Sequence, residues 1–160
     1  MANLKDSGAR REFGTGAVRD VAEGKGRCDL LPLDVVSSIL DSSVLQLVND
    51  YVRNGKIQDL ITAIKMFIIT DHTEWKDIFT GILEVSKQYE DGCQKYGDRN
   101  WEKGIPVHCY IDSGVRHYLK YLRGDTDEPH DRAFVWNMLG AIWTHCHKPE
   151  LIDLPFANEE

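Results

Sequence analysis

The sequence has no apolar run long enough to cross a membrane. Its apolar runs, such as residues 66–69, are far shorter than the roughly 20 residues that a transmembrane helix requires. The first residues are polar, and the apolar segment of a secretory signal does not follow them. We therefore expect a cytoplasmic protein without a membrane partner.

Basic residues are not in excess either. The 160 residues include 19 Lys and Arg against 26 Asp and Glu, which gives a formal net charge of −7. Proteins that bind duplex nucleic acid usually carry a basic surface. Residues 1–27 differ from the rest, because six basic residues there outnumber four acidic ones. An acidic body with a basic entry segment fits a small phosphorylated ligand better than duplex nucleic acid.

Closely spaced cysteines are also missing. The four cysteines stand at positions 28, 93, 109 and 146, without a Cys-x-x-Cys motif. This distribution is typical of free thiols in a reducing compartment. His108-Cys109 and the His-Cys-His stretch at 145–147 hold possible zinc ligands, but their spacing matches no standard zinc site.

A Walker phosphate loop is absent, although glycines recur through residues 1–27. Two glycine-containing segments could each wrap an anion with backbone amides and a cation, and Lys25 and Arg27 would supply the cations of the second. The glycines predict an irregular arm. The apolar stretch that ends this arm predicts that residues 1–33 dock on the rest of the chain.

Apolar residues at three- and four-residue steps predict helices through most of the remaining chain. The expected helices span residues 34–54, 56–69, 73–93, 107–123 and about 129–145. Thr70 or Asp71 could cap the third helix. Gly55 and Gly124 suit helix ends, and Pro129 suits a first helical turn.

No strand pattern stands out beside these helices. We therefore predict an all-α fold, a single compact domain of about five helices with an irregular Gly-rich N-terminal arm. The helical domain would span residues 34–147, and a polar tail would follow at 148–160.

One loop concentrates residues suited to a nucleotide. Residues 95–104 read Lys-Tyr-Gly-Asp-Arg-Asn-Trp-Glu-Lys-Gly, and the two glycines predict a break in helical structure. Arg and Lys suit phosphates, an aromatic face suits a base, and an Asn amide suits a base edge. The candidate binding residues are Lys95, Tyr96, Arg99, Asn100, Trp101 and Lys103. The alternative is a solvated loop whose Trp101 folds back into the core.

The last two expected helices carry a second polar group. Asp112 and Arg116 are four residues apart and share a helix face, with His117 on the neighbouring face. His130 and Asn137 are seven apart on the following helix and face the same way. Antiparallel packing would bring these side chains together.

Asp127, in the acidic turn before the last helix, would join this cluster. Carboxylates hold Mg²⁺ or Mn²⁺, the ions bridge phosphate oxygens, and a carboxylate or metal activates water. Arg and Lys neutralise charge that develops on phosphates. Histidine among the ligands favours Mn²⁺ or another transition metal. The alternatives are helix capping by the acidic residues, a surface ion pair and structural histidines.

Five motifs between residues 8 and 145 form a recognisable set. They are Arg19-Asp20, Gly24-Lys25-Gly26-Arg27-x-Asp29-Leu30-Leu31-Pro32, the loop 95–104, Asp112-Ser113-x-x-Arg116-His117, and Gly124-Asp125-x-Asp127-Glu128-x-His130 with Trp136-Asn137. Together they resemble the bacteriophage dATP/dGTP diphosphohydrolase N-terminal domain family. The resemblance implies a mostly helical phage protein that handles nucleotides in an infected bacterial host. It also suggests kinship with MazG-like all-α pyrophosphohydrolases, which use metal-bound carboxylates.

Three functions are consistent with these residues. The first is metal-dependent hydrolysis of a purine (deoxy)nucleoside di- or triphosphate, with Mg²⁺ or Mn²⁺ as the cofactor. The second is a phage protein that sequesters a host cyclic or ADP-ribose-type immune signal without cleaving it. The third is a structural or partner-binding phage protein. Because a small helical domain rarely buries so many Trp and Ile residues alone, we also expect a homo-oligomer.

The hydrolytic hypothesis assigns roles to named residues. The candidate catalytic residues are Asp127, His130 and His117. The candidate metal ligands are Asp112, His117, Asp127 and His130. The candidate nucleotide-binding residues are Lys95, Tyr96, Arg99, Asn100, Trp101, Lys103, Arg116, Lys25, Arg27 and Asn137.

Overall fold

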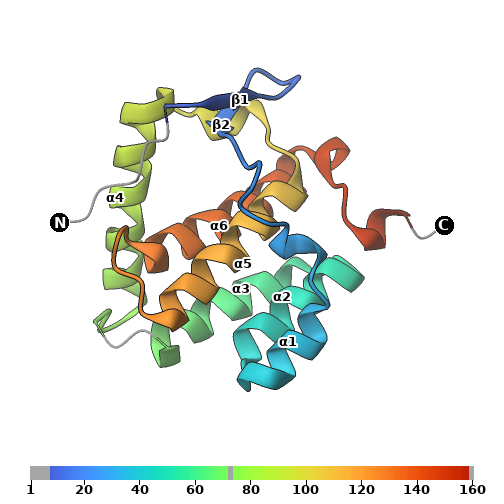
Figure 1. Cartoon of the computed structure of the whole chain (residues 1–160), viewed down its shortest axis with the longest axis vertical. Helices are drawn as coiled ribbons and strands as arrows, with labels where there is room; N and C mark the ends of the chain where they lie inside the picture. The colour runs from blue at the N-terminus through green and yellow to red at the C-terminus, as the bar shows by residue number, and fades with distance from the viewer. Residues whose placement is uncertain (1–7, 72–73, 159–160) are drawn as a thin grey trace.

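The two long C-terminal helices share the largest helix–helix interface of the fold. In the computed structural model, which describes residues 8–71 and 74–158, α5 spans Val107–Arg123 and α6 spans His130–His147. A short turn joins them, so they pack antiparallel (Figure 1). Gly140 allows this close packing, because a Cβ atom there would lie 2.3 Å from the Tyr110 ring.

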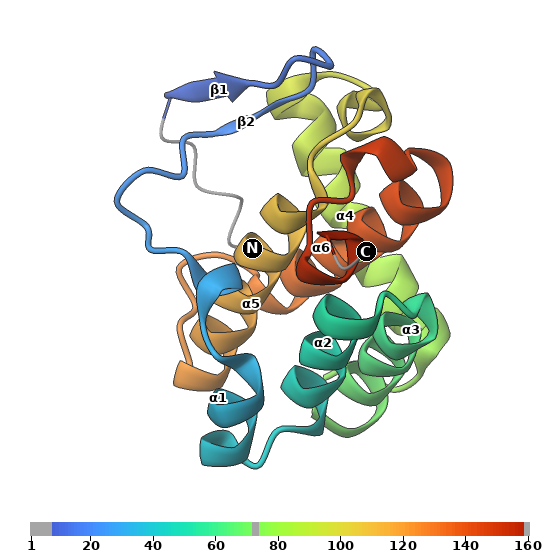
Figure 2. The same cartoon turned by 90° about the vertical axis from the view of Figure 1, so that its right-hand side faces the viewer.

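Four further α-helices surround this pair in the described part of the chain. They are α1 (Leu33–Leu40), α2 (Ser43–Asn54), α3 (Ile57–Met66) and α4 (Ile78–Tyr96), and a π-helical turn, η2 (Phe67–Asp71), continues α3. Figures 1 and 2 show α1, α2 and α3 gathered at one end, with α4 beside α6. The predicted all-α fold is confirmed, with one α-helix more than expected.

The expected helix at 34–54 is wrong, because it is two helices. Asp41 ends α1 in the left-handed conformation, with φ of +50°. The Ser42 side chain then caps α2 by accepting a hydrogen bond from the Leu45 N–H. Such a hydroxyl satisfies one of the free N–H groups at a helix start. The apolar pattern continued across this break and concealed it.

The third predicted helix begins later than expected. Its predicted first residue, Thr73, lies outside the described residues, and α4 starts at Ile78. Asp77 caps it by accepting a hydrogen bond of 2.8 Å from the Thr80 N–H. The predicted cap, Thr70 or Asp71, belongs instead to η2. At its other end α4 continues to Tyr96, three residues beyond the predicted end.

The arm contains a two-stranded antiparallel hairpin that the sequence pattern did not predict. Strand β1 (Arg10–Glu12) pairs with β2 (Val18–Asp20), with Arg10 opposite Asp20. Figure 2 shows the hairpin beside the C-terminal end of α4, and a 3-10 turn, η1 (Cys28–Leu30), leads from the arm towards α1. The hairpin thereby reaches the loop 95–104.

The C-terminal segment is also docked on the helices. It follows α6 as two 3-10 helices, η4 (Pro149–Leu151) and η5 (Pro155–Asn158). Asp153 accepts a hydrogen bond of 2.9 Å from the His108 N–H at the start of α5 and also contacts the His108 ring. Phe156 packs edge-on against Tyr51, with ring centroids 5.7 Å apart.

The core runs from α2 through η2 to α6. Phe67 lies at its centre, with ring centroids 4.8 Å from Phe134 and 5.9 Å from Tyr118. Apolar side chains such as Ile39 and Phe79 remain exposed on α1 and α4, so the expected homo-oligomer stays a prediction. Among the described residues, no helix combines the length and apolar character needed to cross a membrane.

Candidate functional site

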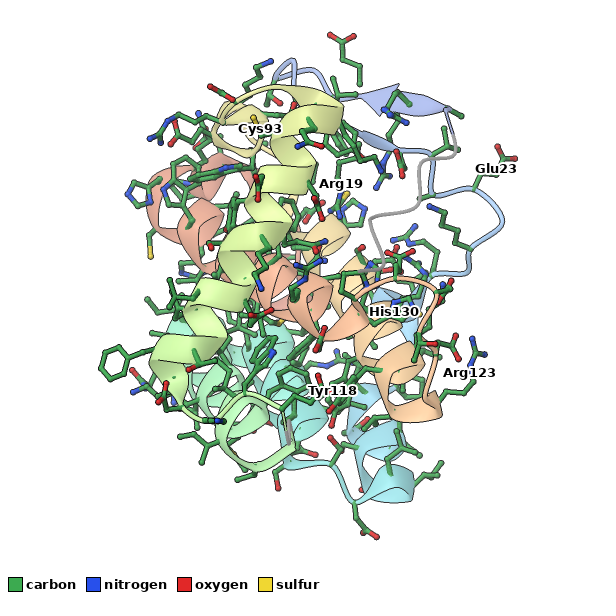
Figure 3. All side chains as sticks on the ribbon, turned by 90° about the vertical axis from the view of Figure 1, so that its left-hand side faces the viewer. Arg19, Glu23, Cys93, Tyr118, Arg123 and His130 are labelled. Atoms are coloured by element: carbon green, nitrogen blue, oxygen red, sulfur yellow. The ribbon has the colours of Figure 1, made fainter. Side chains whose placement is uncertain are left out.

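A cavity of about 460 Å³ lies between the hairpin, α4 and the α5–α6 pair. Its lining comes from β2, the segment after β2, α4, the loop 95–104, α5, α6 and the turn between these last two helices. A volume of this size is typical of small-molecule sites. Figure 3 shows Arg19 near the C-terminal half of α4, with His130 further along the molecule.

The loop 95–104 holds the hairpin over the cavity. Asn100 accepts a hydrogen bond from the Val18 N–H and donates one to the Val18 carbonyl, both 2.8 Å long. The Asn100 side-chain amide therefore pairs with the backbone of Val18 in β2, as the backbone of a neighbouring strand would. The loop also contains the short 3-10 helix η3 (Asn100–Lys103), which Arg99 precedes with a positive φ of 55°.

Asp20 is the second anchor of the hairpin. Its carboxylate accepts hydrogen bonds from Lys95 Nζ at 3.0 Å, Tyr96 Oη at 2.8 Å and Arg10 at 2.9 Å. Burial lowers the pKa of Lys95, but its hydrogen bonds and charge interactions with Asp20 and Tyr96 together outweigh burial, so the pKa is raised overall. Burial raises the pKa of Tyr96, and its hydrogen bond to Asp20 adds to this. Two predicted nucleotide-binding residues thus already have a protein partner.

Arg19 lies between these two anchors and faces the cavity. Its guanidinium lies 5.4 Å from the Trp136 ring centroid and 5.5 Å from that of Tyr110. It donates to Asn137 Oδ1 at 3.2 Å and to Ser113 Oγ at 3.3 Å. Burial lowers its pKa, but an arginine stays charged in proteins. No carboxylate of the described residues forms an ion pair with Arg19, so a half-buried cation faces the cavity without a counter-ion among those residues.

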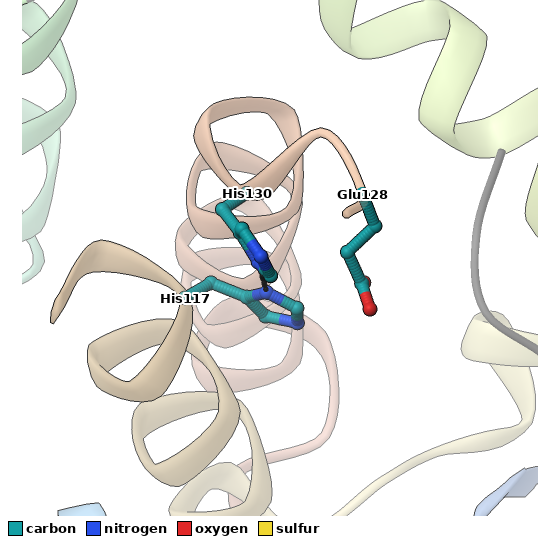
Figure 4. A group of neighbouring side chains, drawn as sticks. All are labelled: His117, Glu128 and His130. Atoms are coloured by element: carbon teal, nitrogen blue, oxygen red, sulfur yellow. Dashed lines mark hydrogen bonds between the residues drawn. The ribbon is translucent and has the colours of Figure 1, made fainter. Parts of the chain in front are cut away.

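A chain of hydrogen bonds links two histidines and an aspartate at the other end of the cavity. The Nδ1 atoms of His117 and His130 are 2.9 Å apart, and His130 Nε2 lies 2.7 Å from Asp127 Oδ1. Figure 4 shows the two rings in contact, with the second nitrogen of His117 on the side of Glu128. The side chain of His130 is fully buried, whereas His117, Asp127 and Glu128 line the cavity.

This cluster has the donor atoms of a metal site. One ligand atom from each of His117, Glu128 and His130 lies within 4.8 Å of the others, and Asp125, Asp127 and His130 form a second such group. The pKa of His117 is lowered to about 3, mainly by burial and to a smaller extent by His130 and the cations Arg19, Lys120 and Arg116. A neutral imidazole is the form that binds metal ions.

Asp112 holds the arm against α5. It is 4% exposed, pairs with Arg116 at 2.6 Å and accepts a hydrogen bond of 2.6 Å from the Cys28 N–H. Arg116 also donates to the carbonyl of Gly26 at 2.7 Å. Asp112 lines the cavity but belongs to neither potential metal group of the described residues.

Most of the predicted site residues meet at this cavity. Those that line it are Lys25, Lys95, Tyr96, Arg99, Asn100, Trp101, Asp112, Arg116, His117, Asp127 and Asn137. His130 lies behind His117 and contacts it. Two lie outside the cavity lining: Arg27 is exposed and forms a two-point ion pair with Asp29, and Lys103 is exposed.

Sequence reasoning missed several residues of the lining. Those with the clearest chemistry are Arg19, Gln88, Tyr89, Lys120 and Trp136, and Glu128 was expected in the acidic turn beside Asp127 but was given no role. Glu128 and Arg19 stood inside recognised motifs, so their neighbourhood was a usable indication. Gln88 had only its position on the helical face that also carries Lys95, seven residues further on.

A family described as dATP/dGTP diphosphohydrolase, N-terminal, matches residues 70–153. The match contains α4, the loop 95–104, α5 and α6, and therefore the histidine cluster. It leaves out the hairpin, so the motifs of the arm lie outside it. No curated protein and no solved structure matches the chain.

Proposed function

The chain belongs to the dATP/dGTP diphosphohydrolase N-terminal family, and from this premise we propose that it hydrolyses a phosphoanhydride bond of a purine (deoxy)nucleoside di- or triphosphate. The observation that carries the proposal is Arg19, a cation that has no counter-ion among the described residues and lies in the same cavity as His117 and Glu128. Removing a charge from water is costly unless an opposite charge compensates it. A phosphate group in the cavity would supply that charge.

Other cations of the cavity support the same ligand. Arg116, Lys120 and Arg19 are all near enough to His117 to lower its pKa. Burial lowers the pKa of Lys25, and Asp20 opposes this while Arg116 adds to it. Several cations around one histidine suit a polyphosphate, whose charges are spread over many oxygens.

The aromatic side chains of the cavity suit the base. The Tyr89 ring centroid lies 5.9 Å from Trp101 and 5.8 Å from Trp136. Stacking of a base on an aromatic side chain contributes roughly 1–3 kcal/mol. We place the base beside these rings and the phosphates between Arg19 and His117.

The His117, Glu128 and His130 group fits a divalent metal ion in its donor atoms. Two imidazoles and a carboxylate suit Mn²⁺ or another transition metal, whereas Mg²⁺ would use Asp127 and Glu128 with water. Such an ion neutralises phosphate charge and lowers the pKa of bound water. Both nitrogens of His130 already have a partner, so ligation by His130 would replace one of those contacts.

The remaining residues take supporting roles in this proposal. While His130 keeps its present hydrogen bonds and does not bind the ion, His130 and Asp127 orient the His117 ring, as the outer partners of metal-binding histidines do. Asp112 was expected to bind metal, but its carboxylate is shared by Arg116 and the Cys28 N–H. We therefore propose that Asp112 positions Arg116. Lys95 and Asn100 hold the hairpin and act on the nucleotide through Arg19.

The test is a panel of nucleoside di- and triphosphates incubated with Mn²⁺, with Mg²⁺ or with EDTA, followed by chromatography of the products. We expect a new product only with a metal ion. Arg19→Gln should lower kcat/KM by about 10- to 100-fold, the range for a lost hydrogen bond to a charged group. Arg27→Gln is the matched control, because Arg27 lies in the same arm outside the cavity, and its kcat/KM should stay within about twofold.

The same panel addresses sequestration of a nucleotide signal without cleavage. The cations and aromatic rings would hold such a ligand without any metal ion. Recovery of an unchanged nucleotide from heat-denatured protein, in the presence of Mn²⁺, would contradict hydrolysis and establish a binding protein.

A further inference from the structure

Gln88 is a buried amide that the proposed roles leave unused. It lies in α4, is 6% exposed and lines the cavity. Its Oε1 atom is buried without a hydrogen-bond partner in the described structure. An unpaired buried polar group is unfavourable, and such groups in a folded protein call for an explanation.

The surroundings of Gln88 suit a flat ring. Tyr89, the next residue, contacts Trp101 and Trp136 in the same cavity wall. Gly92, one helical turn further on, also lines the cavity, and a Cβ atom there would meet nothing within 4 Å. The cavity face of α4 therefore carries an unpaired amide, an open space at Gly92 and then Lys95, which Asp20 already pairs.

We infer that Gln88 binds the polar edge of the purine base, an inference that rests on the proposed nucleotide site. A side-chain amide offers an acceptor and a donor side by side. Adenine presents its 6-amino donor beside the N1 acceptor, and guanine presents its O6 acceptor beside the N1–H donor. The two patterns are opposite, and the amide satisfies each in one of its two orientations.

The missing protein partner is what permits both orientations. No side-chain hydrogen bond to another described residue fixes the Gln88 amide, so a half turn about its last side-chain bond exchanges oxygen and nitrogen. A single residue then accepts both purines in one pocket. A glutamine that served packing alone would be replaced by leucine without any change in base preference.

The experiment measures binding by calorimetry in EDTA, so that cleavage does not interfere. The ligands are dATP, dGTP and the deoxynucleoside triphosphate of unsubstituted purine, which has no group at position 6. Wild-type protein should bind dATP and dGTP about tenfold more tightly than the third compound, as expected for one lost hydrogen bond. Gln88→Leu should bind all three within about twofold of one another.

A second variant and a control sharpen the result. Gln88→Glu places only acceptors against the base, so it should favour dGTP, whose N1–H and 2-amino group donate, over dATP by about tenfold. Gln94→Leu is the matched control, because Gln94 is exposed on the same helix outside the cavity, and it should keep the wild-type preference. Thermal unfolding of each variant confirms that it is folded.

The outcomes separate this inference from hydrolysis. Selective binding by the wild-type protein that Gln88→Leu abolishes supports the role of Gln88, even if no nucleotide is cleaved. Wild-type base preference in Gln88→Leu overturns it, even if the protein is a hydrolase. Equal binding of dATP and dGTP by Gln88→Glu also overturns it, and absence of binding to all three ligands overturns both proposals.

Discussion

The Nδ1 atoms of His117 and His130 share one hydrogen bond, so only one of them can carry the hydrogen. His130 Nε2 faces the Asp127 carboxylate and must donate to it, which leaves His130 Nδ1 as the acceptor. His117 is therefore protonated on Nδ1, and its Nε2 lone pair is free. Figure 4 shows that this nitrogen lies on the Glu128 side. Asp127 thus determines the tautomer of His117 through His130, without contacting His117 itself.

We expect Asp127→Ala to disturb His117 at a distance. Without the carboxylate, His130 no longer has to carry its hydrogen on Nε2, and His117 loses its single preferred form. Nitrogen-detected NMR of the imidazoles should show His117 in the Nδ1–H form in the wild-type protein and a mixture in the variant. Metal affinity should fall about 10- to 100-fold, as is usual for outer partners of ligating histidines. If His117 keeps a single unchanged tautomer in Asp127→Ala, Asp127 does not determine that tautomer through His130.

Stability should fall in mild acid because of His117. Its pKa of about 3 in the folded protein lies below the ordinary value of 6.5, so the unfolded chain binds a proton that the folded protein refuses. The free energy of unfolding should therefore decrease by up to about 1.4 kcal/mol for each pH unit between 6.5 and 3. Urea unfolding between pH 4 and pH 8 measures this slope. His117→Asn should flatten it, whereas His147→Gln, at an exposed histidine, should leave it unchanged.

Asp20→Ala should release the hairpin from α4. The variant removes the shared acceptor of Arg10, Lys95 and Tyr96, and we expect a loss of about 2 kcal/mol in unfolding free energy. Nucleotide affinity should fall at least as far, because Arg19 is the next residue along β2. Chemical unfolding and calorimetry measure the two effects. Glu12→Ala, on an exposed side chain of the same hairpin, should change neither.

Two glycines should respond to alanine in opposite directions. At Gly140 the new methyl group would meet the buried Tyr110 ring at 2.3 Å, so the variant should lose about 1–3 kcal/mol of stability. At Gly92 nothing lies within 4 Å, and alanine favours a helix interior by about 0.5–1 kcal/mol. Thermal unfolding of both variants should give shifts of opposite sign. A stabilised Gly140→Ala would contradict the close contact of α5 and α6.

The helices could be predicted because their apolar faces repeat locally, but the breaks between them could not. Asp41 and Ser42 end one helix and cap the next inside an apolar pattern that continues from α1 to α2. The cap of α4 is Asp77, but Asp71, six residues earlier, has the same capping side chain, so the sequence did not distinguish between them. The hairpin strands are three residues each, too short for an alternating pattern to be recognised.

For the site, residue types indicated which side chains line the cavity better than they indicated the hydrogen-bond partners of those side chains. Asn100 and Lys95 were expected to contact the nucleotide, and both line the cavity, but their hydrogen bonds go to Val18 and Asp20. Those partners are 82 and 75 residues away in the sequence. Pairings over such distances depend on the complete fold. Arg19 was given no role for the same reason, because its lack of a counter-ion among the described residues becomes visible only in the fold.

The site is built from two separate segments of the chain, which polar contacts hold together. The matched segment 70–153 supplies α4, the loop 95–104, the α5–α6 pair and the histidine cluster, whereas Arg19 and Lys25 come from the N-terminal arm outside it. The arm is attached to the loop 95–104 by a few hydrogen bonds, among them those between Val18 and Asn100 and between Asp20 and Lys95. We therefore expect substitutions at Arg19 and Lys25 to change anion binding more than they change the packing of the helices against one another. The arm would in this sense determine ligand specificity, while the matched segment keeps the geometry of the histidine cluster.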